Sequence, residues 1–177
     1  MEVIVTIVLV PMVKNKLNLS FTLIELLITV TIIFIFSGLS LAYYNNFTQE
    51  QQLKNEAKKF VDVLELAKKK ALVGDYGDSN FLYGYRVITS TSYYRLVRCQ
   101  NINCSPYQEI KTFNIPSNIS FLNTYYIHFL PLTAKVNSNA PSFPVSIQIR
   151  MSSINKCITV ETTQFGIINL GETLISC

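Results

Sequence analysis

The feature that most constrains this chain is a long apolar segment near its N-terminus. No Asp, Glu, Lys or Arg occurs from Leu26 to Gln49, and Leu26–Leu41 is almost wholly apolar. Counted from Phe21 to Tyr44, the segment has 24 residues. As a helix it would be about 36 Å long, enough to cross the hydrocarbon core of a bilayer. Lys14 and Lys16 precede it, so the positive-inside rule predicts a single pass with a cytoplasmic N-terminus.

One acid interrupts this segment. Glu25 lies inside Phe-Thr-Leu-Ile-Glu-Leu-Leu (21–27), and no Lys or Arg follows it within two helical turns. A carboxylate costs about 2.5–3.5 kcal/mol at the membrane centre and less near an end, so an acid here predicts a function and a cationic partner. The amino group created by a cut just before Phe21 would be such a partner.

The residues around this acid carry a family resemblance. Ser20-Phe21-Thr22-Leu23-Ile24-Glu25-Leu26-Leu27, after a short basic leader, resembles the processing site of type IV pilins and type II secretion pseudopilins. The resemblance implies that a prepilin peptidase cuts between Ser20 and Phe21 and methylates the new N-terminus. It also implies that Glu25, the fifth mature residue, pairs with the N-terminal amine of a neighbouring subunit during filament assembly. Each charge alone is costly in a low dielectric, whereas the pair is tolerated.

The predicted leader peptide is 1–20. The family favours Gly before the cut, whereas this chain has Ser20, which is also small. A start at Met12 would give a leader of nine residues with two lysines, so we expect Met1–Pro11 to be a start-site artefact.

Three other interpretations of the apolar segment stay open. An ordinary secretory signal peptide would be cut after the small-x-small sequence Ser40-Leu41-Ala42. A simple membrane anchor would stay uncut, which would make the chain a signal-anchored periplasmic protein unrelated to filaments. A buried helix of a soluble protein is disfavoured by the length of the charge-free run.

A second helical pattern follows the apolar segment. Its apolar positions recur every three or four residues, as on one face of a helix: Leu53, Ala57, Phe60, Val61, Leu64, Ala67 and Ala71. The opposite face offers the i,i+4 ion pairs Glu50–Lys54 and Glu65–Lys69. Gly74 supplies a stop signal, so we predict one continuous helix from Phe21 to Val73. It would comprise a transmembrane, filament-core part (21–44) and an amphipathic continuation (45–74).

Short runs rich in Tyr, Ile, Val, Phe and Thr fill residues 75–177 and predict an extracytoplasmic β-domain. The predicted strands are Phe81–Ile88, Tyr93–Arg98, Glu109–Ile115, Ile119–Phe129, Val145–Met151, Cys157–Thr162 and Gly166–Leu170, with a loop around Pro131–Pro144 between two sheet regions. The predicted fold class is therefore α+β, a long N-terminal helix packed on an antiparallel β-domain, as in the pilin fold.

Three further segments resemble the FimT/GspH group of minor pilins and pseudopilins. They are Leu64–Ala71, which resembles an L-x-x-A-R-x-x-A pattern, and the elements Ile127–Leu132 and Ile158–Ile168. The resemblance implies a structural minor subunit of a type IV pilus-like or type II secretion filament. It would reside in the inner (cytoplasmic) membrane and then in the filament. Its implied partners are the prepilin peptidase, other pilin or pseudopilin subunits, the inner-membrane assembly platform and membrane lipid.

The four cysteines all fall on the predicted extracytoplasmic side, where disulfides form. Four cysteines allow three connectivities. We predict Cys99–Cys104, closing a short loop at a strand end, and Cys157–Cys177, attaching the C-terminal tail. A metal site is the alternative, although Cys-x4-Cys without a nearby His is poor zinc spacing.

Composition bears on the remaining function classes. Charged residues make up 15% of the chain and its mean hydropathy is +0.29, which excludes a disordered protein. Residues 79–177 carry seven basic and three acidic side chains, so DNA binding by the β-domain is an alternative function.

The single histidine, His128, is flanked by apolar residues on a predicted strand, which favours a packed or surface imidazole over a catalytic one. No catalytic motif accompanies it, and we expect neither enzymatic activity nor a cofactor.

Overall fold

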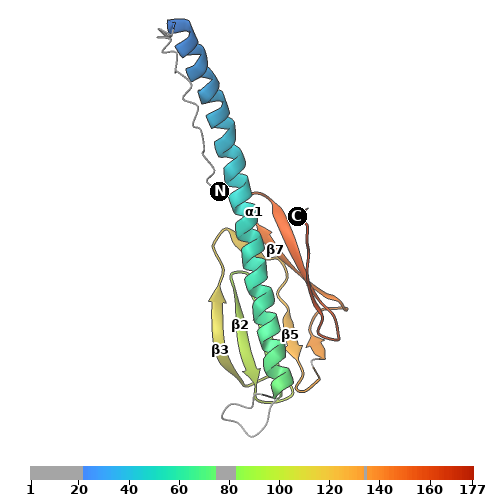
Figure 1. The fold of residues 1–177 in the computed structure, drawn as a ribbon. Coiled ribbons are helices and arrows are strands. Elements are labelled where there is room, and N and C mark those ends of the chain that lie inside the picture. Colours follow the sequence, from blue (N-terminus) through green and yellow to red (C-terminus); the bar gives the residue numbers. More distant parts are fainter. Residues whose placement is uncertain (1–21, 75–82, 134) are drawn as a thin grey trace, which may run out of the picture. The chain divides into compact units, whose positions relative to one another are not determined.

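We analysed a computed structural model, which describes residues 22–74, 83–133 and 135–177 (Figure 1). The chain divides into two units, Met1–Leu41 and Ala42–Cys177. One helix, α1 (Leu23–Val73), precedes the strands. The strands of the described residues are β1 (Tyr85–Thr89), β2 (Tyr93–Cys99), β3 (Tyr107–Asn114), β4 (Ile119–Phe121), β5 (Tyr126–Phe129), β6 (Val136–Ser138), β7 (Val145–Met151), β8 (Lys156–Thr162), β9 (Ile168–Leu170) and β10 (Ile175–Ser176).

The helix ends at Val73 as predicted but begins at Leu23: Thr22 precedes it, and Phe21, the predicted first residue, lies outside the described residues. Its C-terminal end follows from the residue after Val73. Gly74 has φ 70°, in the left-handed region. A residue in this conformation often ends a helix, and glycine adopts it readily because it has no Cβ. Two backbone N–H groups, those of Gly74 and Leu132, donate to the carbonyl of Ala71 at 3.4 and 3.0 Å. The second bond fixes the loop after β5 to the end of α1.

The strands of the second unit form two antiparallel sheets. The first sheet has the order β3-β2-β1-β5-β6, and the second has the order β10-β8-β7-β4, with β9 also paired to β8. Most of β3 is exposed, whereas buried and half-buried residues alternate along β1 and β7. This is the pattern of a sheet with one face packed and one face wet. The α+β class predicted from the sequence is confirmed.

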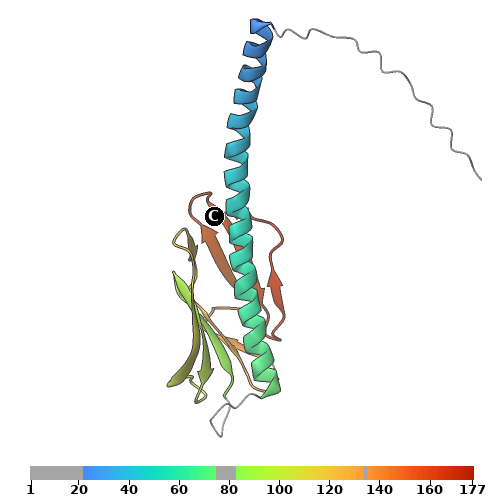
Figure 2. The ribbon, with the colours of Figure 1, turned by 60° about the vertical axis from the view of Figure 1, so that its left-hand side comes forward.

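The core of the second unit lies between α1 and the inner faces of both sheets (Figure 2). The predicted apolar stripe of α1 is buried there, apart from the half-buried Val61. At its centre, the ring of Phe60 meets those of Tyr94 and Phe121 edge-on, at centroid distances of 5.2 and 5.1 Å. Burial raises the pKa of Tyr94 to about 12, with a smaller contribution from the acids Glu56 and Asp62. The phenol is therefore neutral in this core.

One predicted strand was wrong. Residues 119–129, expected as a single strand, form β4 and β5, which belong to different sheets. Thr89, at the end of β1, stabilises the segment between β4 and β5 with two hydrogen bonds. Its N–H donates to the carbonyl of Tyr125 at 2.9 Å, and its hydroxyl donates to the carbonyl of Asn123 at 3.3 Å. The expected loop around 131–144 also contains β6, which pairs with β5.

Two predicted ion pairs of α1 were also wrong in their partners. Glu50 pairs with Lys156, at the start of β8, rather than with Lys54. Glu65 pairs with Lys68 at 3.5 Å, one residue nearer than predicted. The first change has a structural reason, since β8 brings a cation from 106 residues away to the helix. That pair attaches the second sheet to α1.

Candidate functional site

The acid singled out in the sequence lies in the first turn of α1. The hydroxyl of Thr22 accepts a hydrogen bond from the N–H of Glu25 at 3.3 Å, and the Thr22 carbonyl accepts from the N–H of Leu26 at 3.2 Å. Thr22 is therefore the N-cap, and Glu25 is the third helical residue. A carboxylate there interacts favourably with the helix dipole, by about 0.3–1 kcal/mol. The spacing Thr-x-x-Glu is a capping pattern that could have located this helix start from the sequence.

The helix around Glu25 presents apolar side chains in every direction. Its exposed residues include Leu23 at 84%, Phe34 at 74% and Phe36 at 70%. None of the most apolar window of α1 is buried inside the protein, and the helix is long and apolar enough to cross a membrane. A helix that is apolar all round is stable in lipid or among other apolar helices, and not in water. The composition and exposure of this segment therefore suit a lipid environment or a bundle of apolar helices.

The other predicted processing residues are not placed. Ser20 and Phe21 lie outside the described residues, so the predicted cleavage stays a prediction. The remaining predicted site residues are the four cysteines, which all lie in the second unit.

Both predicted disulfides are present. Cys99–Cys104 has a Cα–Cα distance of 4.4 Å, and Cys157–Cys177 one of 5.5 Å. The first is buried beside Val97 and closes the loop between β2 and β3. The second joins β8 to the residue that follows β10.

A buried polar cluster joins β1 and β5, and the sequence analysis missed it. His128 is 1% exposed; its Nε2–H donates to the carbonyl of Tyr83 at 2.8 Å, and its Nδ1 accepts from Nη2 of Arg86 at 3.4 Å. Arg86 also donates to the carbonyl of Asn103 at 3.3 Å and lies over the ring of Tyr126, 4.1 Å from its centroid. One bond needs a donor at Nε2 and the other an acceptor at Nδ1, so the imidazole is neutral. The cluster links two strands and the disulfide loop, and no local sequence pattern indicates it.

Burial lowers the pKa of His128 below its ordinary value of 6.5; the bond to the Tyr83 carbonyl offsets part of this, and the nearby charge of Arg86 adds to the lowering. The unfolded chain therefore takes up the proton first as the pH falls. We expect the free energy of unfolding to be constant above pH 6.5 and to fall, by at most about 1.4 kcal/mol per pH unit, between 6.5 and the folded pKa. Chemical denaturation of the full chain in detergent at pH 5 to 8 measures this. His128→Gln should flatten the dependence; an unchanged slope in that variant would contradict it.

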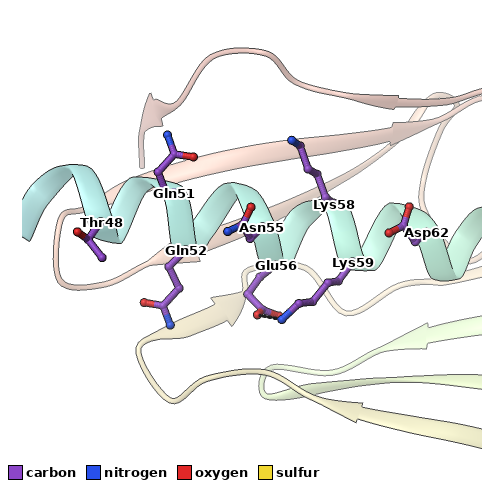
Figure 3. A pocket seen from close by; sticks show the side chains of 8 residues that line it. All are labelled: Thr48, Gln51, Gln52, Asn55, Glu56, Lys58, Lys59 and Asp62. Atoms are coloured by element: carbon purple, nitrogen blue, oxygen red, sulfur yellow. Dashed lines mark hydrogen bonds and ion pairs between the residues drawn. The ribbon is translucent and has the colours of Figure 1, made fainter.

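The exposed face of α1 in the second unit carries an open groove of about 580 Å³ (Figure 3). Its lining combines amides with side chains of both signs of charge: Thr48, Gln51, Gln52, Asn55, Glu56, Lys58, Lys59 and Asp62. Within the groove, Lys59 forms an ion pair with Glu56 at 2.6 Å. No cluster of three potential metal ligands occurs among the residues that the structure describes. The groove offers neither an oriented nucleophile–base pair nor a metal centre, so α1 itself remains the candidate functional element.

No protein-family model, curated protein sequence or solved structure matches this chain significantly. The assignment of function therefore rests on the residues and the fold.

Proposed function

We propose that this protein is a structural subunit, of the minor pilin or pseudopilin kind, of a type IV pilus-like or type II secretion filament. The observation that carries the proposal is the chemistry of α1. Its first part is exposed, apolar all round and charged only at Glu25, whereas its second part forms the core of a β-domain. A long helix with these two parts, followed by antiparallel sheets, is compatible with a pilin-like fold.

In this proposal the apolar part of α1 first lies in the inner membrane and then among the helices of other subunits. Both environments exclude water, so neither hydrates Glu25. An isolated carboxylate is costly there, and a neighbouring subunit's N-terminal amine, equally costly alone, would neutralise it. The pairing fixes the stagger between adjacent helices, because only one register brings the two groups together. Assembly would then require the prepilin peptidase, which frees the amine, and an inner-membrane platform.

The mature N-terminus tests this proposal. We expect N-terminal analysis of the protein from its own host to find N-methylated Phe21, because the amine must be created by cleavage after Ser20. Ser20→Arg, which places a large cation at the cut, should leave the leader attached; Ser20→Gly serves as the matched control and should be processed. A chain beginning at Tyr43 would indicate ordinary secretion, and an uncut chain a simple anchor. Either result would overturn the proposal.

A further inference from the structure

The turn between β8 and β9 exposes two apolar side chains to solvent, Phe165 and Ile167, which together form the Phe165 knob. Phe165 is 73% exposed and Ile167 is 55% exposed. Three hydrogen bonds hold the turn rigid: Gly166 N–H to the Thr163 carbonyl at 3.0 Å, Thr163 N–H to the Ile167 carbonyl at 2.9 Å, and Ile167 N–H to the Thr163 hydroxyl at 3.1 Å. A preorganised aromatic side chain at a turn is the kind of residue that anchors protein interfaces, since little freedom is lost on docking.

A cleft that suits this knob lies on the same unit, between α1 and the other end of the β8–β9 hairpin. Its volume is about 320 Å³ and its lining comprises Lys54, Lys58, Ile158, Leu170, Gly171 and Glu172. Ile158 and Leu170 provide apolar walls. Lys54 and Lys58 place cations at its edge, where they would meet the face of an aromatic ring favourably.

The knob and the cleft are displaced along α1. The pair Glu50–Lys156 places the start of β8 beside residue 50 of the helix, and the cleft follows at Lys54 and Lys58. The turn lies toward the other end of the helix: the Gln164 carbonyl accepts from Val136 on β6, and the loop preceding β6 is bonded to Ala71. The C-terminal strands accordingly run alongside α1 (Figures 1 and 2). At about 3.3 Å per extended residue, Phe165 is at most roughly 16 Å along the chain from Leu170, which ends β9.

We propose that the Phe165 knob of one copy of this chain docks in the Lys54–Leu170 cleft of the next copy. The inference rests on the proposed function, because it takes the α1 helices of neighbouring copies to be parallel. A parallel pair related by a two-fold axis would set knob against knob at the same height. Since knob and cleft lie at different heights, copies joined this way are staggered along α1, and each leaves one knob and one cleft free. Such a heterologous contact does not close and produces a filament.

Site-specific photo-crosslinking tests the contact in the full chain in its own host. A benzophenone amino acid replacing Phe165 should link to a second copy, with the crosslinked peptide mapping to residues 54–58 or 170–172. The same probe at Ile102, which is 77% exposed on the Cys99–Cys104 loop, is the matched control and should not link to that peptide. Links from position 165 that map elsewhere on the second copy, or to no second copy while filaments are present, would overturn the inference.

Two substitutions complete the test. Phe165→Ala should lower incorporation into sedimentable filaments roughly tenfold, as expected for an aromatic anchor, whereas Ile102→Ala should not. Lys54→Glu should weaken incorporation, but Lys59→Glu, the same charge change on a residue outside the cleft, should have little effect. Normal incorporation of Phe165→Ala would refute the contact alone. Absence of the wild-type chain from any filament would refute the proposed function as well.

Discussion

Glu25→Ala is expected to leave the protein in the membrane fraction and to remove it from the filament fraction. The substitution deletes the one charge of an otherwise apolar segment, so insertion into the bilayer becomes easier by up to about 3 kcal/mol. The same change leaves a neighbouring subunit's N-terminal amine without an anion in an apolar environment. Leaving one partner of a buried pair uncompensated costs about 3–5 kcal/mol, enough to exclude the variant in competition with wild-type subunits. Fractionation of cells, followed by quantification of the chain in membranes and in sheared filaments, measures both effects.

The control for this experiment separates the charge of Glu25 from the size of its side chain. Glu25→Gln keeps the size of the side chain and loses the charge, and both variants keep the backbone N–H that donates to Thr22. Glu25→Gln should behave like Glu25→Ala, because both variants lose the charge. A second control is Glu50→Gln, which removes a carboxylate of α1 that lies in the second unit and pairs with Lys156. This variant should still be incorporated into filaments. Wild-type incorporation of both Glu25 variants would remove the reason for assigning that residue a role.

Phe60→Ala should produce the largest loss of stability among single substitutions of the second unit. Phe60 is fully buried, and its ring contacts both sheets through Tyr94 and Phe121. Truncation of a buried Phe costs about 3–5 kcal/mol, because apolar burial is lost and a cavity remains. The expected result is a fall of that size in the free energy of unfolding of the full chain in detergent. Leu66→Ala, on the same helix at 42% exposure, should change it by less than about 1 kcal/mol. Equal effects of the two substitutions would contradict the burial argument.

The parts of the fold that depend on local patterns could be predicted. The charge-free run and the three-to-four-residue stripe each indicate helix, and Gly74 marks its end, so α1 was found almost to the residue. Both disulfides were found because Cys99 and Cys104 flank a strand end and two cysteines remained. What could not be read locally was the division of 119–129 between two sheets, since that break is held by Thr89, about 35 residues earlier in the chain.

The sequence by itself indicated that residues 21–44 form an apolar helix suited to lipid or to other helices, and that Glu25 is its one charge, because hydropathy and periodicity belong to neighbouring residues. Only the tertiary structure decided which distant groups meet: Glu50 with Lys156, and His128 with Tyr83 and Arg86. Such contacts depend on strand register and on how the sheets pack against the helix. Strand register depends on which face of each strand is buried, and all the residues of that face contribute together, so no short stretch of sequence specifies the register.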